Sequence, residues 1–241
     1  MLFALSSLDL YLESEDRVVA QDDNPNPGFS VFRTASNLQT LTLCSDSIMP
    51  ASRVLQFPLH RITTLTLISQ NLYDAELTYE NLQTILPSLV NIEACMLASF
   101  DFILDPTKPR LTLPRLRFLT LVTGKASAID AFLESVTLPS LSTLHISPQS
   151  SLPFIQFLQR SSCPIEVLGL VNATDDVLIE VLKAQELQGT KYLFMTSPGD
   201  NNQGRSSMNS ISDGVLRVLM FRPNGEILFP RLWALTLPGT K

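Results

Sequence analysis

The sequence predicts an α/β solenoid in which short parallel strands alternate with helices or irregular connections. The first observation is the pattern L-x-x-L-x-L formed by Leu116, Leu119 and Leu121, which recurs along the chain every 24 to 27 residues or so, close to the period of leucine-rich repeats. The second is the alternation inside each copy. In a strand, Leu119 and Leu121 point into the core, whereas Phe118 and Thr120 point the other way.

The copies cover nearly the whole chain, so we predict a single leucine-rich-repeat domain over residues 1–241 with about nine repeats. Strands would line the concave face of a curved horseshoe, and helices and irregular loops the convex face. A doubly wound parallel sheet also alternates strands and helices, but it does not explain the same leucines in every strand. The predicted copies are Leu5, Leu8 and Leu10; Leu38, Leu41 and Leu43; Ile62, Leu65 and Leu67; Leu89, Ile92 and Ala94; Leu116, Leu119 and Leu121; Leu141, Leu144 and Ile146; Ile165, Leu168 and Leu170; Thr190, Leu193 and Met195; and Leu232, Leu235 and Leu237.

The connections are predicted from turn residues and apolar periodicity. Polar, Gly- and Asn-containing stretches predict loop insertions near residues 13–31 and 197–210. Ser151 is a candidate N-cap, with Pro153 in the first turn of the helix that it opens. Near-helical spacing of apolar residues predicts helices over 74–86, 126–136, 152–158, 174–182 and 210–220.

Composition excludes several classes of function. The net charge is −6 and the Lys and Arg residues are scattered, so we expect neither nucleic acid nor a membrane as a partner. No apolar run is long enough to span a bilayer, and the N-terminus lacks the basic region of a signal peptide. The chain begins almost inside a strand and ends just after one, so we expect either a piece of a longer architecture or an atypical open solenoid without caps.

Three cysteines, Cys44, Cys95 and Cys163, are too few and too scattered for a disulfide framework. Cys44 and Cys95 are predicted at the same repeat position, two strands and therefore about 10 Å apart, which is too far for a disulfide bond. Reduced thiols without a signal peptide predict an intracellular protein, in the cytoplasm or nucleus.

Several sequence segments resemble the repeat region of fungal F-box/leucine-rich-repeat proteins. Leu-Pro-(Ser/Arg)-Leu-x-x-Leu precedes several strands, and residues 157–165 are similar to the family segment FL-x-RS-x-CP-L. Residues 174–182 resemble its TDDDLIELL helix, and residues 32–38 are also similar. The resemblance implies substrate recognition in a cullin–RING ubiquitin ligase, in which an F-box binds the linker subunit and the repeats bind the target.

Two departures limit what the resemblance implies. No F-box precedes Leu5, so this chain would bind the target, and would meet the linker subunit only if an F-box lies upstream. Many leucine-rich repeats contain a consensus asparagine that forms a ladder from one repeat to the next, and this asparagine is also missing. Its predicted position holds Asp46, Gln70, Leu97, Gly124, Gln149 and Ala173.

No motif for catalysis or for a cofactor stands out. Residues 199–206 imitate a phosphate-binding loop, but Ser and Asn follow where a helix should begin, so we interpret them as a solvated loop. His60 and His145 have no Cys or carboxylate at ligand spacing, which argues against a metal site. We therefore expect no enzyme, no cofactor and no metal. A structural scaffold unrelated to ubiquitin is the second hypothesis, and an enzyme with its site in the concave groove is the third.

The outward strand positions favour protein binding, because they change from threonine to aromatic residues along the chain. Interface anchors are typically aromatic side chains set in pockets, and Gly169 would leave space beside Phe194. The alternative is that the loop after Met195 folds over these side chains. The central outward row is predicted as Thr42, Thr66, Glu93, Thr120, His145, Gly169, Phe194 and Thr236, and the row before it as Thr40, Thr64, Asn91, Phe118, Thr143, Val167, Tyr192 and Ala234. The predicted patch consists of Phe118, His145, Tyr192 and Phe194.

Overall fold

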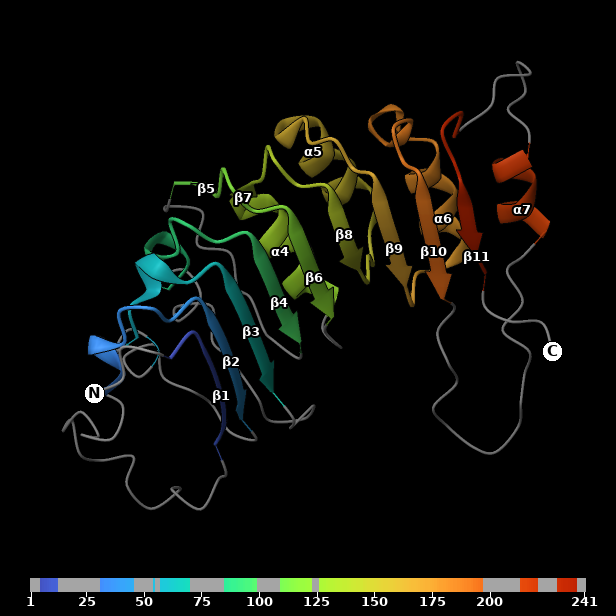
Figure 1. Cartoon of the computed structure of the whole chain (residues 1–241). Helices are drawn as coiled ribbons and strands as arrows, with labels where there is room; N and C mark the ends of the chain where they lie inside the picture. Colours follow the sequence, from blue (N-terminus) through green and yellow to red (C-terminus); the bar gives the residue numbers. More distant parts are fainter. Residues whose placement is uncertain are drawn as a thin grey trace, which may run out of the picture.

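One long parallel sheet organises the protein. Nine strands are hydrogen-bonded in sequence order, from β1 at one end to β11 at the other (Figure 1). This computed structural model describes residues 5–12, 31–45, 54, 57–69, 85–98, 109–122, 126–196, 213–220 and 229–237. The strands of this sheet are β1 (Ser7–Leu12), β2 (Thr40–Ser45), β3 (Thr64–Ser69), β4 (Ala94–Ala98), β6 (Phe118–Val122), β8 (Thr143–Ile146), β9 (Val167–Val171), β10 (Tyr192–Thr196) and β11 (Ala234–Thr236).

The pairing of the strands confirms the predicted leucine alignment at every strand except β4. Leu8 pairs with Leu41, and Leu41 with Leu65, so the first inward leucine of each strand lies beside that of the next. The same alignment continues from β6 through β8, β9, β10 and β11. The protein is therefore an α/β protein with strictly sequential parallel strands, which is consistent with a repeat solenoid.

The predicted position of β4 is wrong by three residues. The inward residues are Cys95 and Leu97, which pair with Leu65 and Leu67, and not Ile92 and Ala94. The reason is an extra turn. The Leu89 N–H donates to the Leu86 carbonyl at 3.0 Å and the Ile92 N–H donates to the Leu89 carbonyl at 3.1 Å before the strand begins.

The new position of β4 also corrects the prediction for the cysteines. Cys44 lies in the row of Ile68 and Ala98, whereas Cys95 lies in the row of Leu65, so the two do not share a repeat position. All three cysteines are free and buried.

A repeated backbone pattern links each strand to the one before it. The carbonyl of Ser6 accepts hydrogen bonds from two consecutive N–H groups, those of Gln39 at 2.9 Å and Thr40 at 3.0 Å. Every later strand repeats this fork, and we call the series the forked carbonyl ladder. Its acceptors are the carbonyls of Ser6, Gln39, Thr63, Glu93, Arg117, Ser142, Glu166 and Lys191.

Helices follow several strands and pack against one another in sequence order, from α4 to α7. They lie on one side of the sheet, and their apolar residues join the strand leucines in one buried cluster (Figure 1). The described helices are α4 (Ala126–Ser135), α5 (Ser151–Ser161), α6 (Asp175–Leu182) and α7 (Asp213–Met220), with the short 3-10 helices η2 (Val31–Thr34), η3 (Leu59–Arg61), η4 (Leu86–Ser88) and η5 (Gln185–Leu187).

Four of the predicted helices are confirmed with shifted ends. The N-cap of α5 is Ser150 and not Ser151, and its side chain makes no capping hydrogen bond. The helix predicted over 74–86 lies outside the described residues up to residue 84, and η4 follows. The insertion predicted at 197–210 also lies outside them, as does that at 13–31 except for Val31, which begins η2.

A small second sheet is an addition to the prediction. Two-residue strands β5 (Leu111–Thr112) and β7 (Val136–Thr137) pair in parallel just before the Leu-Pro segments that lead into β6 and β8. Within the described part of the chain, no helix is long and apolar enough to cross a lipid bilayer.

Candidate binding site on the open face of the sheet

One face of the large sheet carries outward side chains and is not covered by the helices; we call it the open face. The observed register corrects both predicted rows at β4, where Met96 and Ala94 replace Glu93 and Asn91. It also adds Asp9 on β1, beside Thr42, so the first part of the face carries an acidic side chain. The central row reads Asp9, Thr42, Thr66, Met96, Thr120, His145, Gly169, Phe194 and Thr236.

His145 and Phe194 form the centre of the candidate site. They stand on β8 and β10, and their ring centroids are 6.2 Å apart with an interplanar angle of 48°. Gly169 on β9 lies between them in the row. A Cβ atom at this glycine would lie 3.0 Å from two carbons of the His145 ring. The missing side chain of Gly169 therefore gives the imidazole room to lean across β9 toward Phe194.

Tyr192 extends the site toward the last strand. It shares β10 with Phe194, and its ring meets that of Trp233 edge-on, with centroids 6.3 Å apart. Trp233 is 76% exposed and is the single tryptophan of the sequence. Sequence reasoning missed it because it precedes β11 by one residue and belongs to neither outward row. We call His145, Tyr192, Phe194 and Trp233 the aromatic row.

Phe118 lies on the same face but outside the aromatic row. It stands on β6, pairs with Thr143 in the preceding row and is 51% exposed. None of the ring contacts among the described residues includes it. The structure therefore brings together His145, Tyr192 and Phe194 of the four predicted residues. Phe118 is a separate exposed apolar side chain on the open face.

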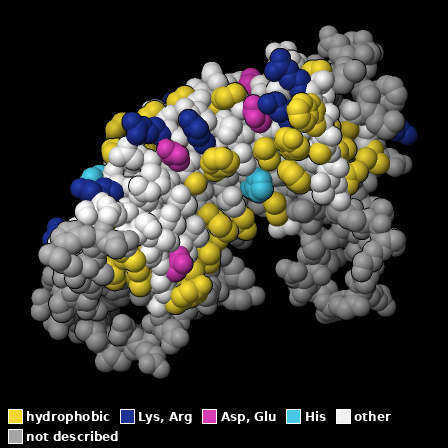
Figure 2. Space-filling model, viewed as in Figure 1, with side chains coloured by type: hydrophobic (Ala, Val, Ile, Leu, Met, Phe, Trp, Pro, Cys, Tyr) yellow, Lys and Arg dark blue, Asp and Glu magenta, His cyan; other side chains and the backbone are white. Residues whose placement is uncertain are grey.

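The distribution of apolar surface follows the aromatic row. Figure 2 shows hydrophobic side chains gathered toward the β8–β11 end of the molecule, whereas the surface over β2 and β3 is mostly of other types. The alternative that the chain after Met195 covers these side chains concerns residues 197–210, which lie outside the described part.

The FL-x-RS-x-CP segment has a clear role in packing. The Arg160 guanidinium donates to the carbonyls of Leu133 at 2.5 Å and Val136 at 3.1 Å, at the C-terminal end of α4. The hydroxyl of Ser161 accepts a hydrogen bond from the Leu138 N–H at 3.1 Å. A positive charge at these carbonyls is favourable, because the C-terminus of a helix carries partial negative charge. The segment therefore ties α5 to the connection before it.

Burial shifts the pKa values of several groups in this scaffold. Burial, followed by the nearby charge of Arg110, lowers the pKa of the Arg160 guanidinium. Burial raises the pKa of the Cys95 thiol to about 12 and that of the Cys163 thiol to about 11. Both thiols are therefore protonated at neutral pH, which makes them poor nucleophiles and poor metal ligands.

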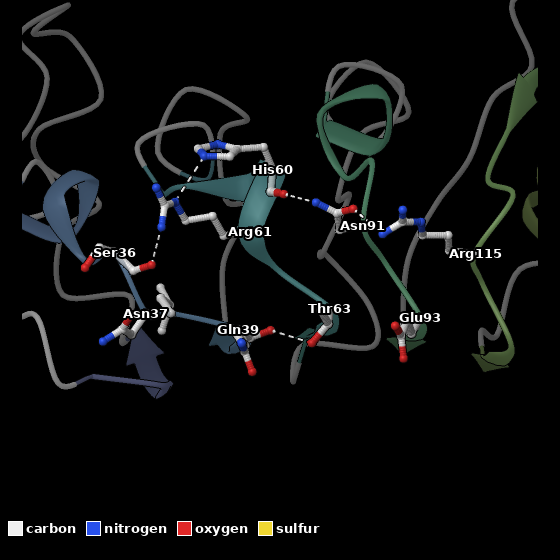
Figure 3. A pocket seen from close by; sticks show the side chains of 10 residues that line it. Ser36, Asn37, Gln39, His60, Arg61, Thr63, Asn91, Glu93 and Arg115 are labelled. Atoms are coloured by element: carbon white, nitrogen blue, oxygen red, sulfur yellow. Dashed lines mark hydrogen bonds between the residues drawn. The ribbon is translucent and has the colours of Figure 1, made fainter.

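A second feature, missed by sequence reasoning, is an open polar groove of about 410 Å³ beside the turns that precede β2, β3, β4 and β6 (Figure 3). It collects between one and four residues from each of four successive turns, so no local motif in the sequence points to it. Its polar side chains come from Ser36, Asn37, Gln39, His60, Arg61, Thr63, Asn91, Glu93 and Arg115.

Among the residues that the structure describes, no group of three or more His, Cys, Asp and Glu side chains could hold a metal ion. The loop at 199–206 that imitates a phosphate-binding motif lies outside those residues. Comparison with family models, with curated proteins and with solved structures finds no match for this chain.

Proposed function

We propose that this chain is a leucine-rich-repeat recognition module, without catalytic activity, that binds a protein target on its open face. The observation that carries the proposal is the aromatic row. Exposed aromatic side chains on a solvated sheet face are typical of interaction surfaces, and Trp and Tyr are enriched among the residues that dominate binding energy. The nine sequential parallel strands with aligned inward leucines support the repeat architecture.

We further propose that the target is a substrate of a cullin–RING ubiquitin ligase and that the chain is the repeat region of an F-box-type adaptor. The support is the resemblance of residues 157–165 and 174–182 to that family. In such an adaptor the linker subunit binds the F-box. This chain would supply the target-binding half, in the cytoplasm or nucleus.

The alternative is a repeat scaffold that binds protein partners outside ubiquitination. One observation favours keeping it. Arg160 and Ser161, which carry part of the resemblance, make hydrogen bonds that any scaffold with this packing needs. The resemblance in that segment therefore supports both hypotheses equally, and the aromatic row serves both.

Target binding is tested by quantitative capture from an extract of the source organism. The double variant Tyr192→Ala/Phe194→Ala is compared with the matched variant Thr40→Ala/Thr42→Ala, which alters the same two rows of the face on β2. A target that depends on the aromatic row is lost only with the first variant, and its binding is then measured with the purified protein. Thermal unfolding checks that both variants fold. Equal capture by all three proteins would refute binding at the aromatic row.

The adaptor hypothesis needs a different experiment. The 5′ end of the transcript is mapped, and the complete reading frame is expressed with a tag. Co-purification of the cullin linker subunit with the complete product, lost when the segment before Met1 is deleted, is the expected result. A complete product that binds the target but not the linker subunit would favour the scaffold.

A further inference from the structure

The polar groove contains two arginines held in fixed positions by neighbouring turns. The Arg61 guanidinium donates to the backbone carbonyl of Ser36 and, through Nε, to Nε2 of His60 at 3.2 Å. Arg115 donates to Oδ1 of Asn91 at 2.7 Å, and Nδ2 of Asn91 donates to the His60 carbonyl at 2.7 Å. These contacts form a chain across four successive turns, which Figure 3 shows as one row of side chains.

No acidic side chain of the described residues forms an ion pair with either arginine. Among the described residues, the ion pairs found are Lys183–Glu180 and Lys191–Glu166, and neither involves the groove. Glu93 lines the groove, but its carboxylate stands apart from both guanidinium groups in Figure 3. The groove therefore carries two guanidinium groups that form no ion pair with a described residue, in a chain with a net charge of −6.

The contacts within the groove leave most of the guanidinium donors unused. A guanidinium has five N–H donors. The hydrogen bonds above use two of them on Arg61 and one on Arg115. The ties between turns therefore fix where the two groups lie and leave donors for a ligand. Guanidinium groups suit carboxylate and phosphoryl oxygens, with which they form paired, charge-assisted hydrogen bonds.

We propose that this groove binds an extended acidic segment of a partner protein, with anionic side chains, carboxylate or phosphoryl, on Arg61 and Arg115. The groove is open to solvent and crosses several turns, which suits a chain segment better than an enclosed small molecule. Arg61 precedes β3 and Arg115 precedes β6, two strands further along the sheet, so their backbones are about 10 Å apart. That distance corresponds to roughly three residues of extended chain. The asparagine and histidine between them offer further polar contacts to its backbone.

This proposal does not rest on the aromatic row or on ubiquitination. The groove lies at the β2–β6 end of the sheet, whereas the aromatic row occupies β8 to β11. A target could occupy both, but each surface is tested without the other. Failure of acidic-peptide binding would leave the proposed function of the open face untouched.

The test uses a fluorescent eight-residue peptide with glutamates at positions 2 and 5 and otherwise neutral residues. The matched peptides carry phosphoserine or glutamine at the same positions. Binding to the full chain is measured by fluorescence anisotropy at low and at physiological salt. We expect both acidic peptides to bind more tightly than the glutamine peptide, and added salt to weaken that preference.

Variants assign the binding to the groove. Arg61→Gln and Arg115→Gln should each raise the Kd for the acidic peptides by about threefold, the effect of a solvent-exposed ion pair of a few tenths to one kcal/mol. Glu93→Gln should lower the Kd, because it removes a negative charge from the groove wall. Arg217→Gln, on the exposed side of α7, makes the same charge change elsewhere and should have no effect.

Several results would overturn the proposal. One is equal binding of the glutamate, phosphoserine and glutamine peptides, and another is an equal loss with Arg217→Gln. If a single-stranded oligonucleotide binds with the same dependence on Arg61 and Arg115, the groove binds polyanions in general and is not specific for an acidic protein segment. If Arg61→Gln disturbs folding through its lost tie to Ser36, Arg115→Gln and Glu93→Gln still decide the outcome.

Discussion

The two ends of the sheet share a scaffold and differ in the surface that they present. From β1 to β4, half of the two outward rows is threonine, beside Ser7, Asp9, Ala94 and Met96, and polar side chains gather in a groove beside the strands. Tyr11 on β1 is an isolated aromatic residue at this end and is 71% exposed. From β8 to β11, it carries the aromatic row. Yet Leu41, Leu65, Leu144 and Leu168 are all fully buried at the equivalent inward position.

The difference teaches that the inward and outward positions of these strands respond to separate demands. Inward positions must fill a core of constant depth, so they remain leucine or a residue of similar character. Outward positions contribute little to that core, so their chemistry is free to differ from strand to strand. Four predictions test how complete this separation is.

The largest effect is expected at the inward leucines. Leu65→Ala on β3 and Leu168→Ala on β9 should each lower the free energy of unfolding by about 2 to 5 kcal/mol, because each leaves a cavity in a closed core. Urea denaturation measures both. Thr66→Ala and Phe194→Ala, on the open face of the same two regions, should cost less. A Leu168→Ala loss far below that of Leu65→Ala would show that the two ends do not share one scaffold.

A pH-dependent effect should appear in both regions through the buried thiols. The ordinary pKa of 9.0 rises to about 12 at Cys95 and about 11 at Cys163, so folding favours the protonated thiol. The resulting stabilisation is complete below pH 9 and is lost as the pH rises through the folded-state values. For each thiol, the free energy of unfolding should fall with a slope that approaches about 1.4 kcal/mol per pH unit. The loss per thiol should therefore reach about 1.4 kcal/mol by pH 10.

Single replacements separate these thiols from lysine and tyrosine, which also titrate in this range. The difference in unfolding free energy between the wild type and Cys95→Ala should shrink from pH 8 to pH 10, and Cys163→Ala should behave in the same way. A difference that stays constant over this range would mean that the thiols are not held protonated by the fold.

A smaller effect is expected from the arginines that reach back to an earlier connection. Arg160 is half-buried and donates to carbonyls at the end of α4, whereas Arg61 is exposed and donates to the Ser36 carbonyl. Arg160→Met should lower the free energy of unfolding by about 1 to 2 kcal/mol, and Arg61→Met by less. The two losses of unfolding free energy are measured by urea denaturation. Equal losses would show that the hydrogen bond to an earlier connection stabilises the fold to the same extent whether the arginine is half-buried or exposed.

The smallest effect concerns the aromatic row itself. Gly169→Val should cost about 0.5 to 1 kcal/mol more in the wild type than in a His145→Ala background, because the new side chain displaces the imidazole that leans across β9. A double-mutant cycle in urea measures this coupling. Additive losses would mean that His145 moves aside freely and that the packing against Phe194 is not fixed.

The sequence predicts the strands well because their leucine spacing is dictated by the core. It fails at β4 for a specific reason. Leu86-Pro87-Ser88-Leu89 imitates the approach to β6, but a second turn follows, and Cys95 then occupies the position where a leucine is expected. Because Cys95 takes an inward position that is leucine in the neighbouring strands, a search for leucine spacing selects Leu89, Ile92 and Ala94 instead of the true inward residues.

The candidate sites were predictable only in part. The alternation of strands places His145, Tyr192 and Phe194 on one face, but it carries no information on Trp233, which reaches Tyr192 from outside the strand. The groove is invisible to sequence reasoning because Arg61, Asn91 and Arg115 are brought together by strand stacking alone. The sequence alone gives no structural role to the FL-x-RS-x-CP segment. In the structure, Arg160 of this segment donates a hydrogen bond to a carbonyl near the end of α4.

The forked carbonyl ladder has a consequence for how such a protein changes over evolutionary time. Each strand takes its position from the strand before it through the same pair of hydrogen bonds, with partners about 25 residues apart in most steps. A duplicated gene segment that encodes one complete step can therefore join the stack without disturbing the others. The open face can lengthen, shorten or acquire new chemistry one step at a time.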